Sequence, residues 1–141
     1  MPLQSLSTAI WISFPEKLRS KHDQLMNSLR FDEEGAFTIY KSDSPNHATI
    51  IEFFLVDLEQ VKSIESSVAV KFSICTNWLK RQQDYTFKKY VNLGLSISFE
   101  IGGWLDNDNQ LYDFVIPPNL LRELGRLDLP IEFTLNDYYR Y

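Results

Sequence analysis

Apolar and polar residues alternate in several segments of the chain, which is the pattern of a strand with one buried face. The segment 48–56 differs because it is apolar on both faces, which favours a central strand covered on both sides. Gly102-Gly103 and the polar run 106–110 interrupt the alternation and predict a hairpin loop between two strands. The strands expected on this basis span residues 9–14, 37–42, 48–56, 68–75, 95–101, 111–116 and 131–135.

Helical spacing of apolar residues appears in three other segments. Pro15 begins a helix predicted over 15–29, and a shorter amphipathic helix is predicted over 57–65. The pair Pro117-Pro118 opens a third helix, whose apolar stripe is formed by Leu120, Leu121, Leu124 and Leu127. Residues 76–92 fit neither a period of 3.6 nor one of 2, and we interpret them as a helix followed by a loop.

Together these elements predict one α+β domain over residues 1–141. The expected order is β-α-β-β-α-β-(α)-β-β-α-β, with about seven mostly antiparallel strands and two or three helices packed on one face. The chain contains no repeat, low-complexity segment or Gly/Ser-rich linker that would indicate a second domain.

The composition narrows the classes of function. Nineteen acidic residues against fourteen basic ones give a net charge of −5, which disfavours binding to the phosphate backbone of nucleic acids. No stretch approaches the roughly 20 apolar residues of a membrane span. The N-terminal residues 1–4 lack the basic and apolar regions of a secretory leader, so we expect a cytoplasmic protein.

Two residues with reactive side chains are interpreted as structural. Cys75 is the only cysteine and lies in a predicted strand, so we expect a buried and unreactive thiol. His22 lies on the apolar stripe of the first helix, where a partly buried histidine with a satisfied hydrogen bond is favoured over a catalytic or metal-binding one.

Motifs of catalysis and metal binding are not found. The acidic run that starts at Asp106 suggests a calcium loop, but Leu111 and Pro117 occupy the places of the required Gly and Glu. We find no phosphate-binding loop, nucleophile elbow or zinc motif. The sequence therefore predicts no metal, no cofactor and no enzymatic activity.

Aromatic and charged residues suggest two kinds of binding surface. A basic and aromatic strip within residues 78–90 is compatible with stacking on single-stranded nucleic acid, or with an ordinary solvated helix and loop; the negative net charge favours the second interpretation. Acidic residues in predicted loops, together with exposed aromatic residues, suit a face that binds a basic protein, although each is also compatible with a solvated loop or terminus. The predicted partner-binding residues are Asp32, Glu33, Glu34, Trp104, Asp106, Asp108, Tyr138 and Tyr139.

The C-terminal third, from Leu95 to Asp137, contains an alternating strand, a polar loop, a second strand and then IPPNLLRELGRLDLPIEFTLND. This segment resembles the C-terminal part of small uncharacterised bacterial α+β domains, some of which are encoded beside polymorphic toxins and act as immunity proteins. The resemblance implies an acidic cytosolic inhibitor of a cognate toxin, such as a nuclease, that occludes the basic active site or a neighbouring surface. The alternative is a small-molecule-binding or catalytic domain with an aromatic-lined pocket, in which His22 or a carboxylate is the polar group.

Overall fold

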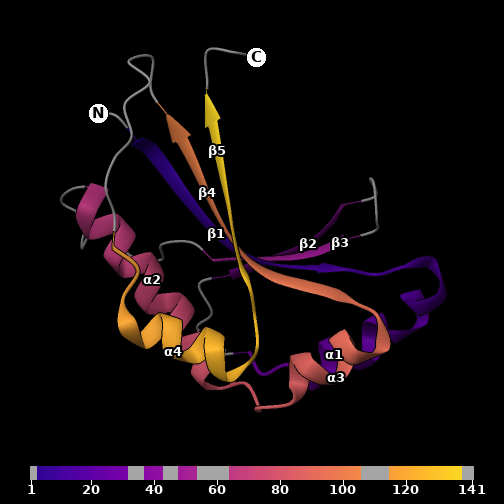
Figure 1. Cartoon of the computed structure of the whole chain (residues 1–141). Coiled ribbons are helices and arrows are strands. Elements are labelled where there is room, and N and C mark those ends of the chain that lie inside the picture. The colour runs from indigo at the N-terminus through magenta and orange to yellow at the C-terminus, as the bar shows by residue number, and fades with distance from the viewer. Residues whose placement is uncertain (1–2, 32–36, 43–47, 54–63, 106–114, 138–141) are drawn as a thin grey trace.

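The computed structural model describes residues 3–31, 37–42, 48–53, 64–105 and 115–137 (Figure 1). Five strands form one sheet in the order β2-β3-β1-β4-β5. Neighbouring strands are antiparallel except for β4 and β5, which are parallel. The strands are β1 (Leu3–Ser13), β2 (Phe37–Ser42), β3 (Ala48–Phe53), β4 (Ser96–Leu105) and β5 (Ile131–Asp137).

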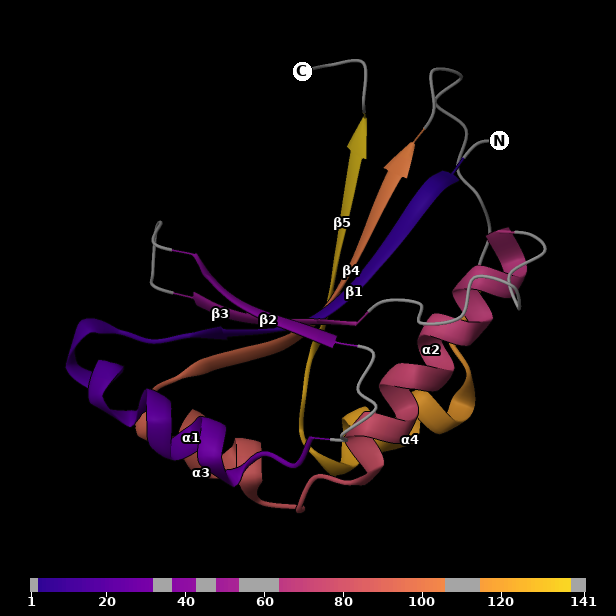
Figure 2. The same ribbon diagram turned by 180° about the vertical axis from the view of Figure 1, so that it is seen from behind.

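All the described helices lie on one side of this sheet, which bends strongly along β1 and β4 (Figures 1 and 2). Helices α2 and α4 cover one end of the bent sheet, and α1 and α3 cover the other. The other side of the sheet carries no described helix. The helices are a 3-10 turn η1 (Glu16–Lys21), α1 (His22–Ser28), α2 (Ile64–Lys80), α3 (Thr86–Leu93) and α4 (Pro118–Arg126).

The predicted class, α+β, is confirmed, but the prediction of seven strands with two or three helices is wrong. The described residues contain five strands and four α-helices. The main error concerns 68–75, which was expected to be a strand and lies inside α2. Val68, Phe72, Cys75 and Leu79 are all buried, which is the spacing of one helical face.

The segment 76–92 was predicted as a helix followed by a loop, and only its first half is correct. The chain leaves α2 at Lys80, turns, and forms the second helix α3 where a loop was expected. Gly94 ends α3 in the left-handed conformation, with a φ of 118°. The Gly94 and Leu95 amides donate to the Val91 and Tyr90 carbonyls, which satisfies the end of the helix.

The strand β4 continues through Gly102-Gly103, where the sequence predicted a break. A Cβ atom at Gly102 would lie 2.5 Å from the Ser7 Oγ atom on β1. The Ser7 hydroxyl instead donates to the Gly102 carbonyl at 3.3 Å. Glycine is therefore needed here for close contact between strands, and it does not end the strand.

Several other predictions fall partly or wholly outside the described residues. The helix predicted at 57–65 lies outside them except for its last two residues, which begin α2. Of the strand predicted at 111–116, only Val115 and Ile116 are described, and neither is in a strand. The remaining strands are confirmed within the described residues, and β3 lies inside the sheet as predicted, but residues 54–56 of the predicted strand 48–56 lie outside them. The helices after Pro15 and Pro117 are also confirmed, although the first of them begins as η1.

The main hydrophobic core lies between the sheet and the helix layer. Alternate residues of β1, β3 and β4 face the helices and are almost completely buried, as are the apolar residues of the helices that cover them. The largest of these side chains include Ile10, Ile12, Ile51, Phe53, Phe99, Leu25, Phe72, Leu79 and Phe87.

Candidate functional site

Most of the predicted partner-binding residues lie outside the described residues. These are Asp32, Glu33, Glu34, Asp106, Asp108, Tyr138 and Tyr139. Trp104 is in β4, where its backbone is in register with Ser5 of β1 and Asn136 of β5. The structure therefore gives no test of this predicted surface as a whole.

The face of the sheet that carries no described helix is formed by the residues that alternate with the core residues. Because Ile10, Ile51 and Phe99 are in the core beneath the helices, their neighbours along each strand face the other way. We call this surface the open face. Its described residues include Ser7, Ala9 and Trp11 of β1, Ile50 and Glu52 of β3, Ser98 and Glu100 of β4, and Glu132 of β5.

Three carboxylates lie in one row across the open face. Ala9 is in register with Glu52 on one side and with Glu100 on the other. Glu100 is in turn in register with Glu132. Neighbouring strands are about 4.8 Å apart, so the Glu52 and Glu100 backbones lie about 10 Å apart, with only the small Ala9 side chain between them.

The two adjacent carboxylates of this row perturb each other. The pKa of Glu100 is raised from 4.5 to about 7, first by desolvation and then by the hydrogen bond and negative charge of Glu132. The Ser98 hydroxyl donates to Glu100 at 3.0 Å and opposes part of this rise. Near neutral pH the Glu100 carboxyl is therefore close to half protonated, and a cation placed beside it would favour its ionised form.

An apolar patch adjoins the carboxylate row. Ala9, Ala48 and Ile50 form a small buried cluster that is separate from the main core. Trp11 is in register with both Ile50 and Ser98, and 37% of its surface is exposed. An accessible tryptophan beside fixed carboxylates is a combination typical of protein interfaces.

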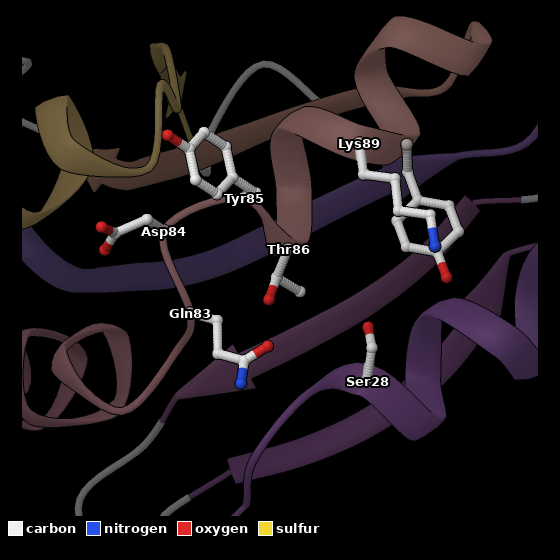
Figure 3. Close-up of a pocket in the computed structure, with 7 residues that line it drawn as sticks. Ser28, Gln83, Asp84, Tyr85, Thr86 and Lys89 are labelled. Atoms are coloured by element: carbon white, nitrogen blue, oxygen red, sulfur yellow. The ribbon is translucent and has the colours of Figure 1, made fainter.

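An open groove lies on the other side of the molecule, in the helix layer. It has a volume of about 550 Å³ and lies between the end of α1 and the start of α3 (Figure 3). Its walls carry hydroxyl, amide, carboxylate and amine groups together with two tyrosines. The lining residues are Ser28, Gln83, Asp84, Tyr85, Thr86, Lys89 and Tyr90.

Gln82 holds one wall of this groove in place. Its side chain is buried and its amide nitrogen donates to the Arg30 carbonyl at 2.8 Å and to the Trp78 carbonyl at 3.0 Å. Its amide oxygen accepts from the Arg30 backbone N–H at 2.9 Å. The two bonds to Arg30 join the chain after α1 to the residues that follow α2.

Arg126 of α4 holds the segment between α2 and α3, which forms part of the groove wall. Its guanidinium donates to the Leu79 and Gln82 carbonyls at 2.8 and 3.0 Å, and so satisfies the end of α2. It also pairs with Asp84 at 2.5 Å and with Glu123 at 3.1 Å. The Asp84 carboxylate at the groove therefore shares the Arg126 charge with Glu123.

His22 and Cys75 do not line the groove. The His22 ring packs 5.2 Å from the Phe14 ring, and its Nδ1 lies 3.1 Å from an Asp23 carboxylate oxygen. Its Nε2 is buried without a hydrogen-bond partner, so the predicted satisfied histidine is correct for one nitrogen only. Cys75 is buried as predicted, although in a helix, and desolvation raises its pKa to about 12.

Sequence reasoning did not find the carboxylate row or the groove. Glu52 and Glu100 each appear in a predicted strand, but the sequence does not show that both pair with Ala9. Within the described part of the chain, no three His, Cys, Asp or Glu side chains are grouped so as to hold a metal ion. Across the same residues, no helix has the length and apolar character needed to cross a bilayer.

Comparison with protein family models, curated proteins and solved structures gave no match to this chain.

Proposed function

We propose that this chain is a non-enzymatic protein-binding module that uses the open face of its sheet to bind a basic protein. The observation that supports the proposal is the row formed by Glu52, Glu100 and Glu132 beside the accessible Trp11. Glu100 and Glu132 place like charges on paired strands, which is destabilising in the free protein, so their presence favours a role outside folding. Glu52 already interacts with the Lys71 charge.

A cationic partner would make this arrangement favourable. A Lys or Arg side chain placed over Ala9 would reach carboxylates on both sides, because Glu52 and Glu100 flank that position. Trp11 would supply a large contact area next to this charge pair. The net charge of −5 would also speed the encounter with a basic protein.

The proposed partner class is a cognate bacterial toxin domain, and the chain would then be a cytoplasmic immunity protein. The resemblance of residues 95–137 to immunity-associated domains supports this choice. Toxins that cut RNA or DNA need a positive cleft to bind phosphates, and such a cleft is complementary to a carboxylate row.

The alternative prediction was a small-molecule-binding or catalytic domain with an aromatic-lined pocket, in which His22 or a carboxylate is the polar group. The groove between α1 and α3 is open and does not include His22, although two tyrosines and Asp84 line it. Its geometry therefore favours neither a catalytic histidine nor a closed apolar ligand site, and we propose no enzymatic reaction.

The test uses the protein as bait, with the product of the neighbouring gene expressed in inactivated form. We expect a one-to-one complex, whose affinity is then compared between Glu132→Lys and Glu16→Lys by titration calorimetry. Both substitutions reverse one exposed charge, but only Glu132 lies in the carboxylate row.

We expect Glu132→Lys to weaken binding at least about tenfold and Glu16→Lys to change it less than about twofold. Equal effects of the two variants would contradict the open face as the binding surface. Failure of the folded bait to capture a basic protein would contradict the proposed function itself.

A further inference from the structure

The groove between α1 and α3 has features of a ligand site that the proposed protein-binding function does not use. It lies in the helix layer, whereas the open face is the opposite surface of the sheet (Figure 1). Its volume of about 550 Å³ falls in the range of small-molecule sites. The residues that line the groove indicate which class of ligand it would bind.

Thr86 provides the first indication. The residue is only 7% exposed, and its hydroxyl has no hydrogen-bond partner among the described residues. Figure 3 shows this hydroxyl directed into the groove, in the space between Gln83 and Ser28. A hydroxyl that faces a groove and makes no bond within the protein can donate to or accept from a bound ligand.

The same residue begins α3, so the groove adjoins the positive end of a helix. The residue before it, Tyr85, makes no capping hydrogen bond through its side chain. Backbone amides in the first turn of a helix and its dipole favour a negatively charged group.

Lys89 places a cation on the same wall, one turn after Thr86. Its amine lies 5.6 Å from the centre of the Tyr90 ring and makes no ion pair with a carboxylate in the described ranges. The acidic residue of the groove, Asp84, is paired with Arg126. Among the lining residues, Lys89 is therefore the cation available to an anionic ligand, although the chain as a whole is acidic.

Tyr85 adds a flat surface to this positive site. Its side chain is 73% exposed and lines one edge of the groove, with its ring on the Asp84 side of the start of α3 (Figure 3). An exposed aromatic ring at this edge can stack on a flat ligand. We propose that the groove binds a small phosphorylated ring compound. Its phosphate would contact Lys89, Thr86 and the start of α3, and its ring would lie against Tyr85.

The test is titration calorimetry on the full chain with adenosine monophosphate and phenyl phosphate as probes, and adenosine as the probe without phosphate. We expect saturable one-to-one binding of both phosphates and none of adenosine. Absence of saturation with either phosphate up to ~10 mM would overturn the proposal, because that limit corresponds to less than about 3 kcal/mol of binding free energy.

Three variants locate the site. Lys89→Gln should weaken phosphate binding about tenfold, whereas Lys17→Gln, which removes an exposed cation of η1, should leave it unchanged. Tyr85→Ala should weaken binding of adenosine monophosphate and phenyl phosphate, and leave them no tighter than inorganic phosphate titrated under the same conditions. Equal losses in the two lysine variants would show non-specific attraction and overturn the assignment.

Thr86→Val separates a ligand-binding role from a structural one. Valine has the same shape but lacks the hydroxyl that has no partner in the free protein. We expect binding to weaken several-fold while the Tm stays the same or rises. A lower Tm with unchanged binding would show that the hydroxyl serves folding and would contradict its role at the ligand.

Discussion

The two faces of the sheet are made from the same strands but have opposite compositions. Beneath the helices, residues such as Ile10 and Phe99 are completely buried. On the open face, their neighbours Ala9 and Glu100 belong to a row that includes two further carboxylates. Burial of apolar side chains therefore explains the composition of the covered face. The carboxylates of the open face are not explained by stability.

The first prediction tests whether stability depends on the covered face. Phe99→Ala leaves a cavity in the main core and should lower the free energy of unfolding by about 3–5 kcal/mol. Trp11→Ala removes a larger side chain from the open face but should cost only about 1 kcal/mol. Urea denaturation measures both, and similar losses would contradict the proposed division between the faces.

The second prediction concerns the connection that holds the helix layer together. Gln82→Ala leaves the Arg30 backbone groups without their partners and should cost about 1–2 kcal/mol. The control is Gln83→Ala, which changes an exposed neighbour and should alter stability by less than about 0.5 kcal/mol. Thermal denaturation distinguishes the two, and equal shifts in Tm would argue against the Gln82 clamp.

The third prediction uses pH to test the carboxylate row. The folded protein raises the pKa of Glu100 from 4.5 to about 7 and so disfavours its ionised form. Stability should therefore be highest below pH 4.5 for this group and fall as pH rises through about 7. Because the group is partly exposed, we expect a loss on the order of 1 kcal/mol.

The Glu100→Gln variant should not show this loss, so its free energy of unfolding at pH 8 should exceed that of the native protein. Glu16→Gln changes an exposed carboxyl far from the row and should keep the native pH profile. Denaturation at a series of pH values gives the comparison. A profile that Glu100→Gln leaves unchanged would show that the row does not oppose folding.

The smallest effect is expected for Glu132→Lys in the free protein. Reversing this exposed charge replaces the repulsion of Glu100 by attraction, so stability should be unchanged or slightly higher at neutral pH. Thermal denaturation checks this before any binding experiment. A clear loss of stability would mean that the row serves folding, contrary to our interpretation.

Short sequence patterns correctly predicted the helices and strands in which local preference and tertiary packing favour the same structure. Pro15 and the Pro117-Pro118 pair mark helix starts because proline fits the first turn, and both helices are present. The alternation around Ile10 and Ile97 correctly predicts strands with one buried face. In these segments the sequence by itself determined the structure.

The tertiary structure decided what local patterns left ambiguous. Residues 68–75 alternate like a strand, yet Val68, Phe72 and Cys75 also fall on one helical face, and packing of α2 against β1 and β3 selects the helix. The carboxylate row and the groove depend on strand register and on helix contacts between residues far apart in the chain. Both candidate sites therefore required the fold, because register and packing are set by long-range contacts that no short segment contains.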